Sequence, residues 1–166
     1  GYTKPTPVQA QSLRPVLAGR DVMVRSKTGT GKTAAFGIPL VELADVSLPA
    51  VQAVVLCNTR ELAMQVANEL ESLGVHKGVQ VAAIYGGASM DEQVRKLKGG
   101  AHIVVGTPGR VIDLIERKLL DLKHVKTAVL DEADEMLSAG FVDAVRTILR
   151  SCPKGHQTAL FSATLP

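Results

Sequence analysis

The first residues that could do chemistry lie in a glycine-rich run, Ser26-Lys27-Thr28-Gly29-Thr30-Gly31-Lys32-Thr33. The run fits the phosphate-loop pattern G-x-x-x-x-G-K-[ST] except at its first position, where serine replaces glycine. Gly29 and Gly31 can adopt positive φ angles, which lets backbone amides point at phosphate oxygens. Lys32 would then reach the β- and γ-phosphates of a nucleotide, and the Thr33 hydroxyl would bind Mg²⁺. The alternative is a plain glycine-rich turn with a surface lysine, but the intact Gly-Lys-Thr favours a site for a nucleoside triphosphate.

Carboxylates follow the apolar run Thr127–Leu130, in the segment Asp131-Glu132-Ala133-Asp134. Mg²⁺ prefers one or two carboxylates and keeps several waters, so Asp131 is a candidate metal ligand. Glu132 could orient and deprotonate an attacking water. The alternative is an acidic helix start, where Asp and Glu are favoured by the helix dipole. Together with the glycine-rich run, the acids predict a site that binds and hydrolyses a nucleoside triphosphate.

Short β-rich runs alternate along the chain with stretches of helical period, which is typical of βαβ units and a parallel sheet. We expect strands over Asp21–Val24, Val51–Cys57, Val79–Ile84, His102–Val105, Thr127–Leu130 and Thr158–Phe161. We expect helices over Pro7–Leu17, Lys32–Leu43, Arg60–Leu73, Met90–Lys98, Gly109–Glu116 and Val142–Leu149. Pro39 should end or kink the second helix, because it lacks an amide proton.

The candidate motifs all follow a predicted strand directly. In an open parallel sheet, ligands bind outside the carboxyl ends of the strands. If the strands are parallel, the motifs therefore share one edge of an α/β domain, whose mostly parallel central sheet would carry helices on both faces.

The bulk composition fits one folded domain. The chain has 166 residues, 46% of them apolar, and a formal net charge of +3; roughly 100–200 residues are typical of one domain. Aromatic residues make up 3%, too few for a base-stacking platform, so any nucleic acid should be held through its backbone. Two isolated cysteines, Cys57 and Cys152, favour a reducing, cytoplasmic compartment over a disulfide framework. No apolar run approaches the roughly 20 residues of a membrane span, so we expect a soluble protein.

The segment Asp131-Glu132-Ala133-Asp134 resembles the motif that names the DEAD-box RNA helicases, and further segments match that family's motifs in order. They are the Q motif Gly1–Gln9, motif Ia Asn58–Ala63, the Gly-Gly element Gly86–Gly87, motif Ib Thr107–Arg110 and motif III Ser162–Thr164. The resemblance covers residues 1–166 and implies a RecA-like P-loop NTPase domain. It also implies an ATP-dependent RNA helicase that uses Mg²⁺ and unwinds RNA duplexes locally.

The resemblance assigns ATP binding to the Q motif and the phosphate loop, at Lys4, Gln9, Ser26, Lys27, Thr28, Gly29, Thr30, Gly31, Lys32 and Thr33. Lys32, Asp131 and Glu132 would be catalytic. Thr33 and Asp131 would hold Mg²⁺. The amide of Gln9 can both donate and accept hydrogen bonds, which suits adenine; the alternative is a surface glutamine on the first helix.

The resemblance assigns RNA contacts to strand-to-helix turns and to the Gly-Gly element, at Thr59, Arg60, Gly86, Gly87, Thr107, Pro108, Gly109 and Arg110. Helix amino termini at such turns offer amides to phosphates. No set of base-reading side chains is evident in the sequence, so binding should not depend on base sequence. The alternative is that Arg60 and Arg110 are structural and pair with a carboxylate such as Glu61 or Asp113. The choice of RNA over DNA as the bound nucleic acid rests on the resemblance alone. Two alternatives stay open: a DNA-directed motor of the same superfamily, and a binding module without ATP turnover.

Motif III couples the ATP state to RNA unwinding in the family that the chain resembles. We expect Ser162 and Thr164 to form hydrogen bonds with the Asp131–Asp134 segment, which would place Asp134 in the same coupling group. The alternative is that these hydroxyls satisfy backbone groups after the last strand, a common use of such side chains.

The chain also departs from the family pattern. Ser26 stands where the family usually has alanine, which should leave the loop intact, and Asn58 stands where it usually has proline, which makes only the rigidity of that turn uncertain. The aromatic residue that the family places before its Q motif is absent, so nucleotide affinity should be weaker. The resemblance implies a second RecA-like lobe with arginines that complete the ATP site. Without that partner, we expect these 166 residues to bind nucleotide with little turnover.

Overall fold

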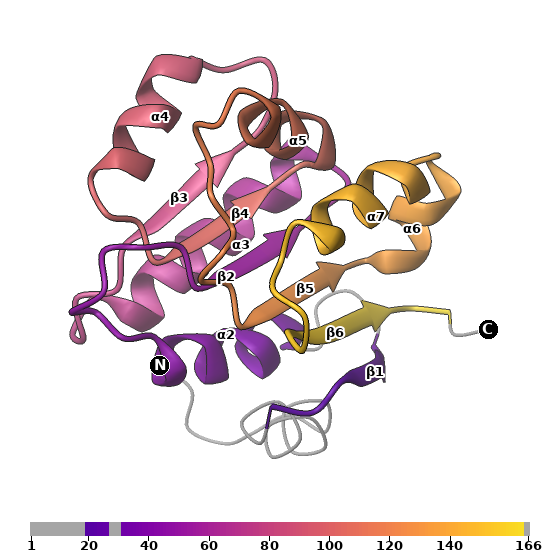
Figure 1. The fold of residues 1–166 in the computed structure, drawn as a ribbon. Helices are drawn as coiled ribbons and strands as arrows, with labels where there is room; N and C mark the ends of the chain where they lie inside the picture. The colour runs from indigo at the N-terminus through magenta and orange to yellow at the C-terminus, as the bar shows by residue number, and fades with distance from the viewer. Residues whose placement is uncertain (1–18, 27–30, 165–166) are drawn as a thin grey trace.

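The computed structural model describes residues 19–26 and 31–164, which form a six-stranded sheet flanked by helices (Figure 1). The strands are β1 (Val22–Arg25), β2 (Ala53–Leu56), β3 (Val81–Ile84), β4 (Ile103–Gly106), β5 (Thr127–Asp131) and β6 (Gln157–Ser162). They lie in the order β1-β6-β5-β2-β4-β3, and each neighbouring pair is parallel. The predicted α/β class with a parallel sheet is confirmed.

Helices cover both faces of the sheet (Figure 1). They are α2 (Lys32–Leu43), α3 (Arg60–Gly74), α4 (Met90–Lys98), α5 (Pro108–Glu116), α6 (Ala133–Ser138) and α7 (Val142–Arg150). Helices α2 and α3 pack in one apolar cluster, and α4 to α7 pack in a second cluster on the opposite face. None of the described helices combines the length and the apolarity needed to cross a membrane.

The central strands divide the core into these two layers. In β2, Ala53 and Val55 face the cluster of α2 and α3, whereas Val54 and Leu56 face the other cluster. Successive side chains of a strand point to opposite faces, and all four of these residues are buried. A parallel strand that is buried on both faces needs an unbroken apolar run, and the sequence of β2 provides one.

Helix α2 continues through Pro39 to Leu43. Of the two expected effects of Pro39, an end or a kink, the structure excludes the end of the helix. A proline inside a helix costs about 3 kcal/mol, because it removes a hydrogen bond and crowds the preceding turn. Phe36 and Leu40 flank Pro39 and are buried in the core, and each fully buried side chain of this kind contributes about 1.5–3 kcal/mol. Packing against the sheet therefore offsets the cost of the proline.

Other differences from the expected elements concern their ends and one short helix. β2 and β3 begin two residues later than expected, at Ala53 and Val81, and β5 includes Asp131. Helix α6 was not expected, because its 6 residues are too few to show a helical period in the sequence. The expected helix Pro7–Leu17 lies outside the described residues.

A glycine lets β4 end in close contact with its neighbours. A Cβ added to Gly106 would lie 2.5 Å from the carbonyl oxygen of Ile84 and 2.6 Å from Cγ2 of Val111. No larger residue fits there without displacing backbone. The close approach lets the amide of Thr107 donate a hydrogen bond to Ile84 O at 2.9 Å, which joins the start of α5 to the end of β3.

Candidate functional site

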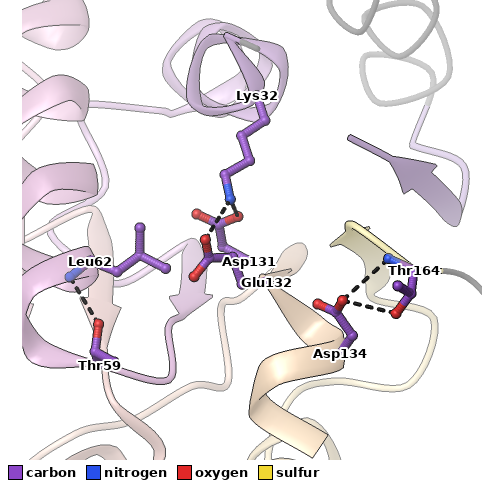
Figure 2. Close-up of polar contacts among 7 residues, drawn as sticks. All are labelled: Lys32, Thr59, Leu62, Asp131, Glu132, Asp134 and Thr164. Atoms are coloured by element: carbon purple, nitrogen blue, oxygen red, sulfur yellow. Dashed lines mark hydrogen bonds and ion pairs between the residues drawn. The ribbon is translucent and has the colours of Figure 1, made fainter. Parts of the chain in front are cut away.

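The carboxyl edge of the sheet brings the start of α2 to the acids that end β5 (Figure 2). Lys32 Nζ lies 3.1 Å from Asp131 Oδ1 and 3.3 Å from Glu132 Oε1. We call these three residues the acid–lysine cluster. A phosphate group bound by Lys32 would lie within reach of both carboxylates.

Two residues with positive φ angles set the geometry of this cluster. Gly31 precedes α2 with φ 80° and ψ 20°, which glycine adopts without strain, so Lys32 begins the helix at its positive end. Glu132 has φ 52° and ψ 52°, which is uncommon for a residue with a side chain. This conformation costs about 1–2 kcal/mol and turns the chain from β5 into α6. Backbone strain of this kind is typical of functional sites.

Asp131 is a carboxylate in a fully buried residue. Desolvation by burial raises the pKa of its carboxyl, although the neighbouring Lys32 ammonium counteracts part of this effect. Neither carboxylate oxygen has a hydrogen-bond partner of good geometry among the described residues, so the Lys32 ion pair is its main compensation. Mg²⁺ binds carboxylate and hydroxyl oxygens. Asp131 and the buried Thr33, which follows Lys32 in the sequence, therefore carry oxygens of the kind that this ion binds.

Cys57 lies just after β2, and the charges of the acid–lysine cluster affect the pKa of its thiol. Burial raises the pKa of its thiol well above the ordinary value, and the negative charges of Asp131 and Glu132 add to this effect. The thiolate is the reactive form of cysteine. A fully buried thiol that stays protonated therefore contributes packing rather than chemistry to this site.

Motif III contacts the acidic segment, and the shortest contacts come from Thr164 (Figure 2). Thr164 donates to Asp134 Oδ2 from its backbone amide at 3.2 Å and from its hydroxyl at 2.9 Å. Desolvation by burial works against ionisation of Asp134, but hydrogen bonds from Thr164, from the backbone of Glu135 and from Ser162 together lower the pKa of the carboxyl. The hydroxyl of Ser162 donates to the carbonyl of Thr164 at 2.6 Å, and a side-chain hydrogen bond from Ser162 also helps to lower the pKa of Asp134. A backbone acceptor two residues away is geometrically easier for this short side chain to reach.

The first candidate RNA residues lie where β2 leads into α3. The hydroxyl of Thr59 accepts a hydrogen bond from Leu62 N at 3.2 Å and caps the helix. Arg60 lies over the ring of Tyr85 at 5.9 Å, and its Nη1 occupies the space beside Gly87, where an added Cβ would be only 2.9 Å away. The expected alternative partner, Glu61, is 4.0 Å away and both side chains are exposed, so this pair is weak.

The second candidate arginine is held by neutral groups. Arg110 Nη1 donates to Gln93 Oε1 at 3.0 Å and to Ala88 O at 3.3 Å. Gln93 Nε2 in turn donates to Tyr85 O at 3.0 Å. We call Tyr85, Ala88, Gln93 and Arg110 the amide link. The alternative pairing of Arg110 with Asp113 is wrong, because Asp113 pairs with the arginine one turn further along α5, Arg117, at 2.8 Å.

Comparison with known proteins identifies the family of this chain. A family model described as DEAD/DEAH box helicase matches residues 6–166. The DEAD-box ATP-dependent RNA helicase CshA of Bacillus cereus (strain ATCC 10987 / NRS 248) is 51% identical over 166 residues, which are 100% of this chain and 32% of that protein. The chain belongs to the DEAD/DEAH box helicase family.

Solved structures of DEAD-box proteins share the fold of this chain. A DEAD box protein from the hyperthermophile Methanococcus jannaschii aligns with a TM-score of 0.93 and 48% identity, over 98% of this chain and 45% of that one. A hypothetical ATP-dependent RNA helicase from Sulfolobus tokodaii aligns with a TM-score of 0.91 and 39% identity, over 100% of this chain and 48% of that one. The expected RecA-like fold is confirmed. The chain spans about a third of the curated relative and about half of the solved chains.

Several of the expected DEAD-box site residues lie outside the described part of the chain: Lys4, Gln9, Lys27, Thr28, Gly29 and Thr30. Ser26, the family departure in the phosphate loop, is buried, and its amide donates to Ser162 O at 2.9 Å. Its hydroxyl has no hydrogen-bond partner among the described residues. The expectation that the loop stays intact concerns residues 27–30, which lie outside the described part of the chain. The structure does not explain why Asn58 stands where the family usually has proline.

Gln93 is a candidate functional residue that the sequence reasoning missed. A signal was available, because Gln93 occupies a core-facing position of α4 between Met90 and Val94, which pack against the core. A polar residue on an apolar stripe predicts a buried hydrogen-bond partner. Which partner it finds depends on contacts with distant segments, and the sequence pattern of α4 does not contain that information.

Proposed function

We propose that this chain is the amino-terminal RecA-like lobe, over residues 1–166, of an ATP-dependent RNA helicase that unwinds RNA duplexes locally. The acid–lysine cluster carries the proposal, because its ammonium and its two carboxylates meet at 3.1 and 3.3 Å on the ligand-binding edge of the sheet. The family to which the chain belongs supports it, as does the ATP-dependent RNA helicase activity in the name of the Bacillus cereus relative.

Lys32 would change partners during the reaction cycle. In the structure its ammonium compensates the buried charge of Asp131. On nucleotide binding it would reach the β- and γ-phosphates, which would leave the carboxylate of Asp131 for Mg²⁺. Thr33 and Asp131 would hold this ion, which neutralises phosphate charge when it is bound.

Glu132 would act on the attacking water. Its side chain is 25% exposed, whereas that of Asp131 is 0% exposed, so the two carboxylates differ in their access to water. Glu132 would orient the water and accept its proton as the water oxygen bonds to the γ-phosphorus. The bond from the γ-phosphorus to the β-phosphate oxygen would break in the same step and release ADP with phosphate. Asp131 would keep the charge that holds the metal.

RNA would be bound at the helix starts on the same edge of the sheet. The amino termini of α3 and α5 offer backbone amides to phosphates, and Thr59 and Thr107 precede them as cap residues. Arg60 and Arg110 would add charge at these positions. Contacts of this kind carry no sequence information, so the binding would be independent of base sequence.

The isolated chain would bind ATP weakly and turn it over very slowly. The chain spans about a third of the curated relative, and we propose that a second RecA-like lobe supplies the arginines that stabilise the transition state. Such an arginine contributes roughly 10³–10⁵ in rate in phosphoryl transfer. RNA-stimulated turnover by the 166 residues alone would contradict this part of the proposal.

The proposal is tested by ATP turnover of the full-length protein in the presence of single-stranded RNA. Lys32→Ala and Glu132→Gln should each abolish turnover. Glu132→Gln should still bind a fluorescent ADP analogue, because the phosphate contacts remain. Lys98→Ala, an exposed lysine at the end of α4, serves as the control and should be unaffected. Turnover at the unmodified rate in both site variants would remove the assignment, and competition between RNA and DNA oligonucleotides would identify a DNA-directed motor.

A further inference from the structure

Helix α4 carries a glutamine at a position where its pattern calls for an apolar side chain. Gln93 is 6% exposed and lies on the side of the helix through which Met90, Val94 and Leu97 pack against the core. Burying an amide costs free energy unless its donor and its acceptor find partners. Both groups of Gln93 have partners: Arg110 belongs to motif Ib, and Tyr85 directly precedes the Gly-Gly element.

The Gln93 amide joins two motifs that are far apart in the sequence. Its Nε2 donates to Tyr85 O, the residue before the Gly-Gly element, at 3.0 Å. Its Oε1 accepts from Arg110 Nη1, in the first turn of α5, at 3.0 Å. Arg110 closes the connection by donating to Ala88 O at 3.3 Å. One buried side chain therefore fixes the loop after β3 relative to the start of α5.

The same arrangement leaves the positive charge of Arg110 available to a ligand. Among the described residues, no carboxylate lies within ion-pair distance of this arginine. Its hydrogen bonds use Nη1 and end on neutral oxygens of Gln93 and Ala88. A guanidinium has five N–H donors in a planar fork that matches phosphate geometry. The neutral partners therefore orient the guanidinium without cancelling its charge.

We infer that Gln93 is a positioning residue for the RNA backbone, which holds the Gly-Gly loop and the Arg110 guanidinium in one preformed arrangement for a phosphate. The inference rests on the RNA binding proposed above. A group that is held in its binding geometry before the ligand arrives loses less conformational freedom on binding. Gln93 contributes through Arg110 and the loop, and does not itself need to touch RNA.

The choice between an amide and a carboxylate at position 93 distinguishes positioning from simple packing. A glutamate would still accept a hydrogen bond from Arg110, but its charge would neutralise the guanidinium and repel a phosphate. Glutamate would also lose the hydrogen bond to Tyr85 O, so a purely structural role would lower the thermal stability and the ATP binding of Gln93→Glu together with its RNA affinity. The positioning role predicts that this variant loses RNA affinity.

The experiment uses the full-length protein with a single-stranded oligouridylate RNA. Gln93→Met keeps the length of the side chain and removes both hydrogen bonds, so the RNA concentration for half-maximal ATP turnover should rise about tenfold. The turnover at saturating RNA and the KM for ATP should stay within about twofold. Gln93→Glu should weaken RNA binding at least as much, and should lower the slope of log affinity against log salt by about 0.7, the value of one single-strand phosphate contact.

Two comparisons make the result specific to this link. Gln80→Met places the same substitution on an exposed glutamine before β3, at the opposite edge of the sheet, and should leave RNA affinity unchanged. Arg110→Gln should lower RNA affinity, and the addition of Gln93→Met should then cause little further loss, because residues of one network are not additive.

The outcomes separate this inference from the function on which it rests. A protein that binds RNA normally in both Gln93 variants would overturn the inference and leave the proposed function standing. A parallel loss of thermal stability, ATP binding and RNA binding in both variants would also overturn it, because only the fold would then be affected. An unmodified protein without RNA affinity would overturn both.

Discussion

The acid–lysine cluster and the amide link lie at the same edge of one sheet, but they hold their charges in different ways. In the cluster, Lys32 compensates a fully buried carboxylate through an ion pair. In the link, Arg110 is held by neutral oxygens of Gln93 and Ala88. The cluster lies in the half of the sheet that contains β5 and β6. The link connects the end of β3 with α5, in the half that contains β4 and β3 (Figure 1).

Under the function proposed above, this difference would give the two regions different tasks in ligand binding. A buried ion pair has to be broken when a phosphate takes the ammonium and a cation takes the carboxylate, so this region exchanges one set of charges for another. A guanidinium held by neutral groups can receive a phosphate without losing a partner. The first arrangement suits a site that changes state during turnover, and the second suits a surface that is already in its binding geometry.

The largest effect on the cluster should follow from the removal of its cation. Lys32→Met leaves the carboxylate of Asp131 buried without a partner, and breaking a buried pair in this way costs about 3–5 kcal/mol. Urea unfolding of the 166-residue chain at neutral pH, without nucleotide, measures the loss. The double variant Lys32→Met/Asp131→Asn removes the orphaned charge and should recover most of the stability. A double variant no more stable than Lys32→Met would show that the ion pair is not what compensates Asp131.

A smaller effect is expected at the proposed RNA contacts, where the side chain of Arg60 packs against Gly87. Gly87 has φ +79°, and Arg60 Nη1 lies 2.9 Å from the position of an added Cβ. Gly87→Ala should therefore cost about 1–2 kcal/mol in the free energy of unfolding, from the left-handed backbone, and should move Arg60 off the Tyr85 ring. Gly86→Ala is the matched control for stability, because its added Cβ meets nothing within 4 Å. Equal stability of the two variants would contradict the geometry described for this loop.

The smallest effect concerns the pH dependence of the contact between motif III and the acidic segment. The hydrogen bonds from Thr164 lower the pKa of Asp134 in the folded chain, so the stabilisation is fully present above the unfolded pKa. It should be lost as the pH falls through the folded pKa. The difference in unfolding free energy between the unmodified chain and Asp134→Asn should accordingly shrink in acid. A difference that grows as the pH falls would mean that this carboxyl has a raised rather than a lowered pKa.

The elements and the placement of the acid–lysine cluster could be predicted because they depend on local patterns and on one topological rule. Unbroken apolar runs such as that of β2 indicate parallel strands, and parallel strands bring motifs that follow them, including Asp131, to a single edge. Helix α6 was missed because it is shorter than two helical turns. The partner of Gln93 was missed because Arg110 is 17 residues away and reaches it only in the folded chain.

The hydroxyl of Ser162 shows a different limit of sequence reasoning. The sequence pattern placed Ser162 just after the last strand, whereas Ser162 is the last residue of β6. A short side chain at this position has acceptors in its own backbone as well as in the neighbouring segment. The Ser162 hydroxyl donates to Thr164 O and also helps to lower the pKa of Asp134, and the balance between these two acceptors depends on side-chain rotation, which the sequence does not specify.

The central claim is that Asp131 and Lys32 together form a site for a metal-bound nucleotide. It is tested most directly by titrating the full-length protein with a fluorescent ADP analogue in the presence and absence of Mg²⁺. In the unmodified protein Mg²⁺ should tighten binding, and in Asp131→Asn this dependence should disappear, whereas Asp91→Asn, an exposed acid in α4, should retain it. Undiminished Mg²⁺ dependence in Asp131→Asn would contradict the account.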